Sequence, residues 1–123
     1  ITMEFPHLMR LVEGNQFDTI YQEHFSYLSF TTVGQIFNHH GLELYDVEEI
    51  PTHGGSLRIF GKHKGDKSKE ISPNVLHMHT LEKNKGLLSL NYYTDFQEKV
   101  KETKWKILEF LIKAILKISS RPV

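Results

Sequence analysis

The sequence predicts an α/β fold in which helices accompany an antiparallel pair of strands. It contains two apolar runs of β type, at residues 42–50 and 57–60, and a five-residue connection between them with one proline and two glycines (PTHGG). So short a connection, made of turn-forming residues, favours antiparallel pairing of its neighbours. Apolar residues at helical spacing on both sides of this pair predict the helices.

The N-terminal segment begins with a short apolar run, residues 1–5, which ends at Pro6. We interpret this run as the end of a buried strand. Pro6 suits the first turn of a short helix, since proline has no amide hydrogen to donate there, and Gly14 is placed to end that helix.

The next segment, residues 17–30, is rich in aromatic residues but has no clean periodicity, which favours a loop with a few extended or helical turns. Either Thr31 or Thr32 could then cap a helix that reaches His40, because a hydroxyl can accept from the free amides of a first turn. Gly41 stands where a helix C-terminal glycine belongs.

The phase of the first predicted strand is imperfect. Leu42 and Leu44 share one face, whereas Tyr45 and Val47 share the other. Either the strand is buried on both faces or a bulge changes its phase. In the second strand Arg58 could contact a phosphate, but we favour a cross-strand ion pair with a neighbouring glutamate.

A change in composition divides the chain into regions 1–65 and 66–123. Residues 61–70 (GKHKGDKSKE) are charged and contain glycine, so we expect a surface connection there. Ser72 and Pro73 predict the start of a helix that ends near Gly86. A long helix follows from about Tyr93, with one apolar stripe and charges over much of the rest; the stripe contains Phe96, Val100, Ile107, Leu108, Leu111 and Ile115.

Composition excludes several classes of function. The 15 Lys and Arg balance the 15 Asp and Glu, so the charge expected of a nucleic-acid-binding protein is missing. The chain has no Cys and therefore no thiolate metal site, which suits a reducing cytoplasm. No stretch is apolar enough to span a membrane. The pairs His39-His40 and His77-His79 lack the four-residue spacing that aims two ligands at one ion, so we expect no metal.

Residues 17–29 (FDTIYQEHFSYLS) resemble the FDxIYxEHxSYxS signature of C-methyltransferases that act on nucleotide-linked keto-deoxysugars. The segments 4–6 (EFP) and 51–58 (PTHGGSLR) are similar to the same family in order and spacing, and 93–96 (YTDF) resembles the opening of its C-terminal domain. Many members have histidine at the position of Gln22, to which we assign no catalytic role.

This resemblance implies a fold and a cofactor. Region 1–65 would be the C-terminal part of a class I (Rossmann-like) methyltransferase domain, whose last two strands form an antiparallel hairpin, and region 66–123 the linker and helical opening of the C-terminal domain. The enzymes use S-adenosylmethionine, bound by a glycine-rich loop after the first strand. We find no such loop, so we expect this chain to be an internal fragment that binds no donor and is inactive alone.

The reaction methylates a carbon next to a ketone, which requires a base for the α-proton and donors for the enolate oxygen. By resemblance the candidate base is His24, since imidazole can accept a proton near neutral pH. Tyr21 could donate to the enolate or a sugar oxygen, and Glu23 could hold a hydroxyl or orient the histidine. In a helical turn Tyr21 and His24 share a face; in an extended segment Tyr21 and Glu23 do.

The glycine-rich turn has two interpretations. His53, Gly54 and Gly55 are explained by turn geometry alone, but they could also bring backbone or an imidazole close to the substrate. Two alternatives to the sugar enzyme stay open. The parent could be a class I methyltransferase with another small-molecule acceptor, or the chain could be a non-catalytic remnant that forms a homodimer through an exposed sheet edge and an apolar helix.

Overall fold

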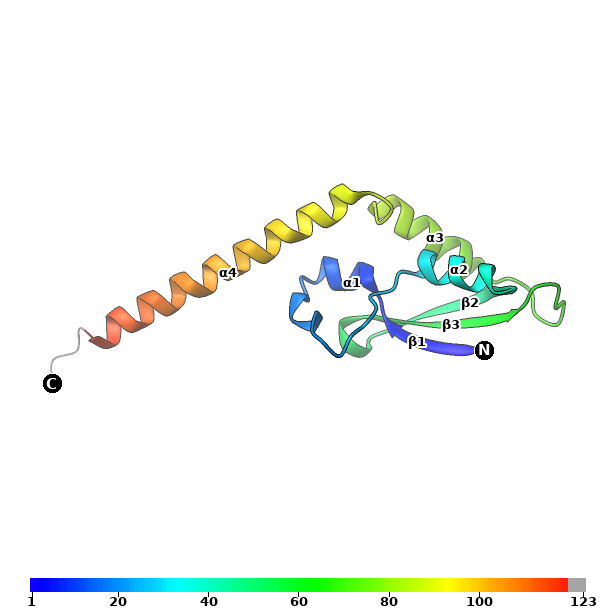
Figure 1. Ribbon diagram of the computed structural model, residues 1–123, viewed down its shortest axis with the longest axis horizontal. Helices are drawn as coiled ribbons and strands as arrows, with labels where there is room; N and C mark the ends of the chain where they lie inside the picture. The colour runs from blue at the N-terminus through cyan, green and yellow to red at the C-terminus, as the bar shows by residue number, and fades with distance from the viewer. Residues whose placement is uncertain (120–123) are drawn as a thin grey trace.

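The computed structural model describes residues 1–119, so the last residues of the predicted region 66–123 lie outside it. Figure 1 shows a sheet with helices beside it and one long helix that leaves this body. The elements are β1 (Thr2–Pro6), α1 (Leu8–Glu13), α2 (Phe30–His39), β2 (Leu42–Ile50), β3 (Ser56–His63), α3 (Pro73–Lys85) and α4 (Leu90–Ser119), with 3₁₀ turns η1 (Phe17–Thr19) and η2 (Thr52–Gly54). The predicted α/β class is confirmed.

The sheet is antiparallel, with strand order β1-β3-β2. The predicted hairpin is confirmed: β2 pairs with β3, and Val47 lies opposite Ile59. A register shift between Leu44 and Asp46 is the bulge that changes the phase of β2. Arg58 forms the expected cross-strand ion pairs, with Nε 2.6 Å from Glu4 Oε1 and Nη1 3.2 Å from a carboxylate oxygen of Glu48.

The strand expected at the N-terminus is present, but the expectation that it is buried was wrong. β1 pairs only with β3, at the sheet edge, and most of its residues are exposed. Pro6 belongs to this strand instead of to the following helix. α1 starts at Leu8 after His7 and ends before Gly14, as the glycine predicts.

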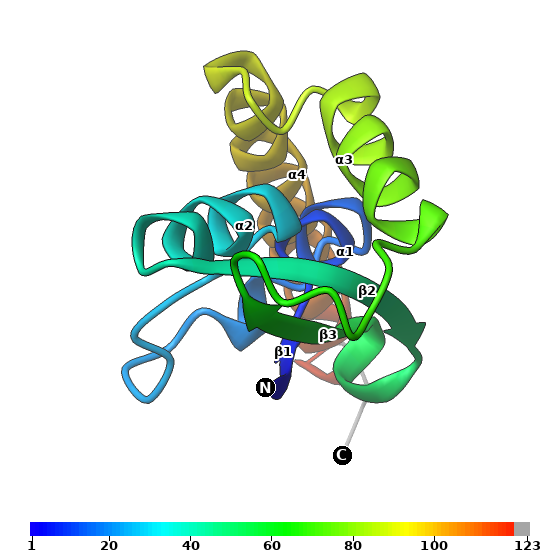
Figure 2. The ribbon, with the colours of Figure 1, turned by 90° about the vertical axis from the view of Figure 1, so that its right-hand side faces the viewer.

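The helices α2 and α3 cover one face of the sheet (Figure 2). The cap of α2 is Ser29, whose Oγ accepts from Thr32 N at 3.0 Å, so the prediction of Thr31 or Thr32 was wrong. The helix starts earlier because Phe30 already belongs to its apolar face and is fully buried. The core of α2, α3 and the sheet consists of Phe30, Val33, Phe37, Leu44, Val47, Leu57, Ile59 and Met78.

A buried hydrogen bond between His7 and Glu82 links α3 to the residue that precedes α1. His7 Nε2 lies 2.7 Å from Glu82 Oε1, and both side chains are fully buried. The Glu82 carboxylate also accepts from Phe30 N at 2.6 Å and Thr31 N at 2.8 Å, which are free amides of the first turn of α2. Burial by itself raises the pKa of Glu82, but the hydrogen bonds from His7, Thr31 and Phe30 outweigh it and leave that pKa below its usual range.

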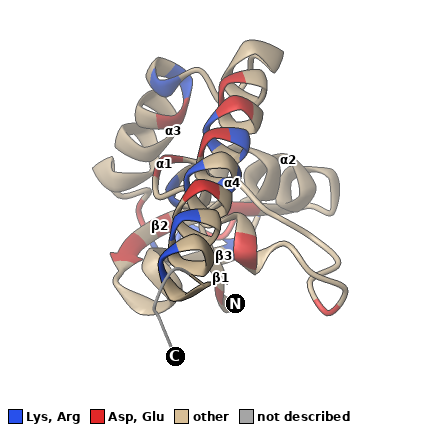
Figure 3. Cartoon of the chain, turned by 90° about the vertical axis from the view of Figure 1, so that its left-hand side faces the viewer, with Lys and Arg blue, Asp and Glu red and all other residues tan. Residues whose placement is uncertain are grey.

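The two C-terminal helices follow the sequence signals at their ends. Ser72 caps α3, Pro73 stands in its first turn, and Gly86 ends it with φ of +88°. α4 starts at Leu90, three residues earlier than expected, and projects away from the sheet (Figure 1). None of its described residues is buried. Figure 3 marks acidic and basic residues along α4, whose large apolar side chains are also exposed.

Within residues 1–119, no helix is both long enough and apolar enough to cross a membrane.

Candidate functional site

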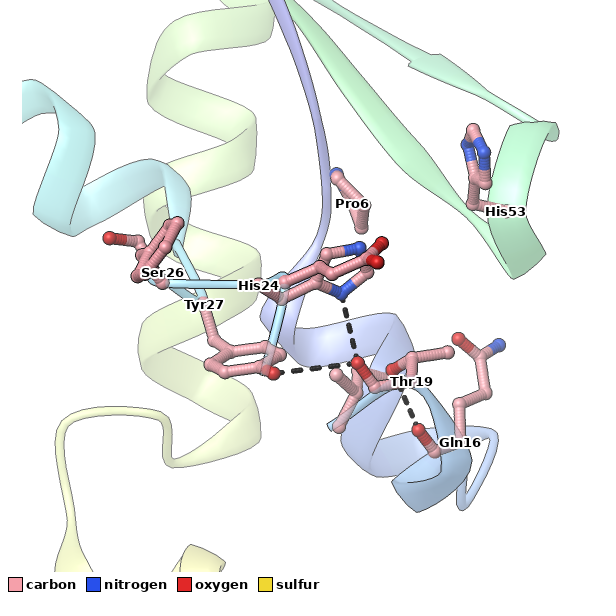
Figure 4. A pocket seen from close by; sticks show the side chains of 10 residues that line it. Pro6, Gln16, Thr19, His24, Ser26, Tyr27 and His53 are labelled. Atoms are coloured by element: carbon pink, nitrogen blue, oxygen red, sulfur yellow. Dashed lines mark hydrogen bonds between the residues drawn. The ribbon is translucent and has the colours of Figure 1, made fainter. Parts of the chain in front are cut away.

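An open pocket of about 410 Å³ lies between the aromatic segment and the β2–β3 turn (Figure 4). Three of the residues that the sequence predicts for the site line this pocket: Glu23 and His24 from the aromatic segment and His53 from the turn. Its size falls in the range of about 300–1,000 Å³ typical of small-molecule sites. The lining residues are Pro6, Leu11, Gln16, Thr19, Glu23, His24, Phe25, Ser26, Tyr27 and His53.

The segment 21–24 forms a tight turn, which settles the geometry that the sequence left open. His24 N donates to Tyr21 O at 3.0 Å, and the two rings lie 4.4 Å apart between centroids at an angle of 40°. Tyr21 and His24 therefore share a face. Glu23 lines the pocket, whereas Tyr21 contacts the imidazole but is not among the lining residues.

The His24 ring is held by a backbone carbonyl. Its Nδ1 lies 2.9 Å from Thr19 O, and because a carbonyl can only accept, Nδ1 carries the hydrogen. In the neutral ring Nε2 is then the nitrogen with a free lone pair, the form needed to accept a proton. The Tyr27 hydroxyl donates to the same carbonyl at 3.4 Å. The Thr19 carbonyl thus orients two side chains that line the pocket.

The β2–β3 turn presents His53 on the other side of the pocket (Figure 4). His53 has φ of +54° and ψ of +35°, the left-handed region that non-glycine residues seldom adopt. Gly54 and Gly55 do not line the pocket. A Cβ on Gly54 would lie 2.2 Å from Gln16 Nε2, and one on Gly55 would lie 2.7 Å from Arg10 Cγ. A side chain at Gly54 or Gly55 would therefore meet the side chain of Gln16 or Arg10.

The pocket lining contains histidines and one carboxylate but no lysine or arginine. Such a surface can exchange hydrogen bonds with hydroxyl and carbonyl groups, whereas it offers no permanent cation to a diphosphate. Among residues 1–119 there is also no group of three or more His, Cys, Asp or Glu side chains arranged to hold a metal ion.

Comparison with known proteins identifies the family. The C-methyltransferase C-terminal domain model matches residues 51–119, more than half of the chain. The chain belongs to this C-methyltransferase family. It is also 34% identical over 109 residues to the C-methyltransferase NovU of Streptomyces niveus, a match that covers 89% of this chain and 26% of that protein. The chain thus spans about a quarter of the length of this relative.

Among the lining residues that the sequence did not single out, Gln16, Thr19 and Tyr27 form hydrogen bonds around His24 and the β2–β3 turn. Thr19 and Tyr27 stand inside the motif that resembles the family signature, but their part in orienting His24 depends on a carbonyl, which sequence does not reveal. Gln16 directly precedes the motif. Its contact with Gly54 joins residues 38 positions apart, and no local pattern indicates it.

Proposed function

We propose that this chain supplies the acceptor side of a C-methyltransferase that methylates a carbon next to the ketone of a nucleotide-linked deoxysugar. The observation that carries the proposal is the His24 ring, whose Nδ1 donates to Thr19 O and whose Nε2 is thereby left as the basic nitrogen beside a pocket. Membership of the C-methyltransferase family supports the reaction class. The sugar rests on the resemblance of the 17–29 motif.

The proposed chemistry is proton abstraction. His24 Nε2 takes the proton from the α-carbon, and the electron pair of the broken C–H bond moves through the new C=C bond to leave the ketone oxygen as an enolate. Tyr21 contacts the imidazole but does not line the pocket, so in this proposal it supports the His24 ring and does not donate to the enolate or to a sugar oxygen. Glu23 and His53 line the pocket and can hydrogen-bond sugar hydroxyls. Because the lining contains no lysine or arginine, we propose that the sugar ring occupies this pocket and that the diphosphate lies outside it.

The methyl donor in the proposal is S-adenosylmethionine, bound outside the residues described. In the described part of the chain no strand runs through a glycine-rich loop into a helix: β1 leads through His7 to α1, the β3–α3 connection contains the single Gly65, and the two glycines of the β2–β3 turn join strands. The residues present therefore do not form a donor site of that kind, and we derive no step from it. We also propose that region 1–65 ends a class I methyltransferase sheet and that region 66–123 opens the next domain.

The test uses a chimera in which this chain replaces the matching segment of the Streptomyces niveus C-methyltransferase. Solvent deuterium exchange at the sugar α-carbon, measured without methyl donor, reports the base alone. We expect His24→Gln and His24→Ala to slow both exchange and methyl transfer by about 10²–10⁴-fold. The matched control is His40→Gln, on an exposed residue at the end of α2, which should keep both rates.

Each result of this experiment has a defined meaning. Exchange that survives both His24 substitutions would reject His24 as the base. Methyl transfer without any exchange in the parent chimera would favour a methyltransferase with a different acceptor, because only C-methylation needs an acidic carbon proton. Tight binding of S-adenosylmethionine by the unmodified chain, measured by calorimetry, would contradict a donor site outside it.

A second candidate function, self-association without catalysis, is supported by α4. Its C-terminal half exposes large apolar side chains: Trp105 is 65% exposed, Phe110 70% and Leu116 62%. Lys106, Glu109 and Lys113 lie along one narrow stripe, so apolar residues occupy most of the circumference. Apolar area of this kind favours association with another surface.

Sedimentation equilibrium of the chain tests this candidate. A homodimer should dissociate when Trp105→Gln and Leu116→Gln are combined, whereas the control pair Lys106→Gln and Lys113→Gln should leave the mass unchanged. A parent chain that stays monomeric at micromolar concentration would reject this candidate.

A further inference from the structure

Gln16 connects the two walls of the pocket. Its side-chain Nε2 donates to Gly54 O at 3.1 Å, across a separation of 38 residues. The side chain lies in a slot between two glycines: a Cβ on Gly54 would be 2.2 Å from Nε2, and one on Gly14 would be 2.8 Å from it. A methyl group at either glycine would meet the end of the Gln16 side chain, so this amide lies close against both residues.

The backbone of Gln16 leads to the other wall. Its carbonyl accepts from Thr19 N at 3.1 Å and from Thr19 Oγ1 at 2.8 Å. The Thr19 carbonyl in turn accepts from His24 Nδ1 at 2.9 Å. Hydrogen bonds therefore connect His24 to Thr19, Thr19 to Gln16, and Gln16 to Gly54, the residue after His53. Figure 4 shows the first two of these links.

The turn that Gln16 contacts needs support. His53 has a left-handed backbone, with φ of +54°, which an isolated histidine does not favour. Within the turn, Gly55 N donates to Thr52 O at 3.0 Å, and His7 N donates to Gly55 O at 3.0 Å. In the described part of the chain, Gln16 is the side chain from outside residues 51–56 that donates a hydrogen bond to the backbone of this turn.

We propose that Gln16 is a positioning residue, which fixes the His53 turn relative to His24 and thereby sets where the acceptor sugar is held. The part about the sugar rests on the proposed function; the part about the turn does not. Loss of the Gln16 donor should free the turn while the sheet and the His24 segment stay folded. His53 would then lose its fixed distance to the opposite wall of the pocket.

The first experiment decides the inference without any sugar. Amide hydrogen exchange is measured by NMR on the ¹⁵N-labelled chain for parent, Gln16→Met and the control Gln35→Met, which alters an exposed residue of α2. We expect Gln16→Met to speed exchange of the Gly55 amide at least tenfold and to leave the Ile59 amide, in the centre of the sheet, unchanged. Equal Gly55 exchange in the two Met variants would overturn the inference.

A second variant reaches the same contact from the other side. Gly14→Ala places a methyl group 2.8 Å from Gln16 Nε2 without touching the turn, at a residue with an ordinary φ of −80°. It should displace the Gln16 amide and accelerate Gly55 exchange as Gln16→Met does. Unchanged exchange in a folded Gly14→Ala chain would count against the inference, even if Gln16→Met were to unfold.

The second experiment follows the imidazole carbon resonances of His24 and His53 during titration with a thymidine-diphosphate-linked 4-keto-6-deoxyhexose. In the parent both should shift; in Gln16→Met the His53 response should need at least tenfold more sugar. An identical titration in parent and Gln16→Met would overturn the claim that Gln16 sets the sugar position. A parent chain that shows no shift at all would reject the proposed function, while the exchange experiment would still decide the role of Gln16.

Discussion

Glu82→Ala should destabilise this fold severely, because one carboxylate accepts from two buried donors and one partly buried donor. His7 Nε2 lies 2.7 Å from it, Phe30 N 2.6 Å and Thr31 N 2.8 Å. A buried donor left without an acceptor costs about 1–3 kcal/mol. With three donors affected and water in the vacated space recovering part of the loss, we expect the free energy of unfolding to fall by about 3–5 kcal/mol.

Glu82→Gln is the milder and more specific version of the same change. The amide keeps the shape of the carboxylate and one acceptor oxygen, but its NH₂ group would point at a backbone or imidazole donor. The negative charge at the N-terminus of α2 is also lost, where the helix dipole favours an anion. We expect the free energy of unfolding of this variant to be about 1–3 kcal/mol lower than that of the parent.

Urea unfolding followed by far-ultraviolet circular dichroism measures both losses. With a urea dependence of about 1–3 kcal/mol per molar for small proteins, the midpoint of Glu82→Ala should fall by more than about 1 M. The control is Glu98→Gln, which removes an exposed carboxylate paired with Lys101 at 2.8 Å and should leave the midpoint within error. If Glu82→Gln unfolded at the same midpoint as the parent, the buried carboxylate would not stabilise the fold as argued.

Three further predictions concern packing and pH. Gly61→Ala should lower the free energy of unfolding by about 1–3 kcal/mol, because the new Cβ would lie 2.4 Å from Cε1 of the buried Phe37. Gly34→Ala should instead raise the free energy of unfolding by up to about 1 kcal/mol. Gly34 lies in the middle of α2, and its Cβ would meet nothing closer than 3.5 Å. The reverse order of their urea midpoints would contradict this pair. Because the pKa of Glu82 is lowered in the folded state, the unfolded state binds its proton first as the pH falls. Stability should therefore decrease below about pH 4.3, by up to about 1.4 kcal/mol per pH unit, and a Glu82→Gln chain with the same acid slope would refute this assignment. Burial first, and then a nearby carboxylate, raise the pKa of Tyr92 to about 12. The folded state thus keeps a proton that the unfolded state loses near pH 10, so the free energy of unfolding should fall above that pH. Tyr92→Phe should abolish the highest step of an ultraviolet tyrosine titration. A parent chain without that step would disprove the raised pKa of Tyr92.

Several elements could be predicted because their signals are local. Ser72, Pro73 and Gly86 fix the ends of α3 through capping chemistry that acts within one helical turn. The proline and glycines between residues 50 and 56 predict the hairpin for the same reason. The 17–29 motif indicated the C-methyltransferase family, because a long ordered set of residues rarely matches by chance.

The candidate site was predicted in part. The sequence selected His24, Glu23 and His53, and the structure brings these three to one pocket. It did not select Gln16, nor did it show that the Gln16 side chain donates to the carbonyl of Gly54. Catalytic residue types can be recognised one by one, whereas the contacts that orient them join distant segments.

The sequence by itself determined the α/β class, the hairpin, most helix ends and the family, since periodicity, capping and motif are properties of neighbouring residues. Only the tertiary structure decided that β1 pairs with β3 at an exposed edge and that Glu82 receives donors from His7 and from the first turn of α2. A glutamate on a helix predicts a solvent-exposed charge when read alone. It is buried here because its partners, 51 to 75 residues away in sequence, offer three hydrogen bonds in place of water.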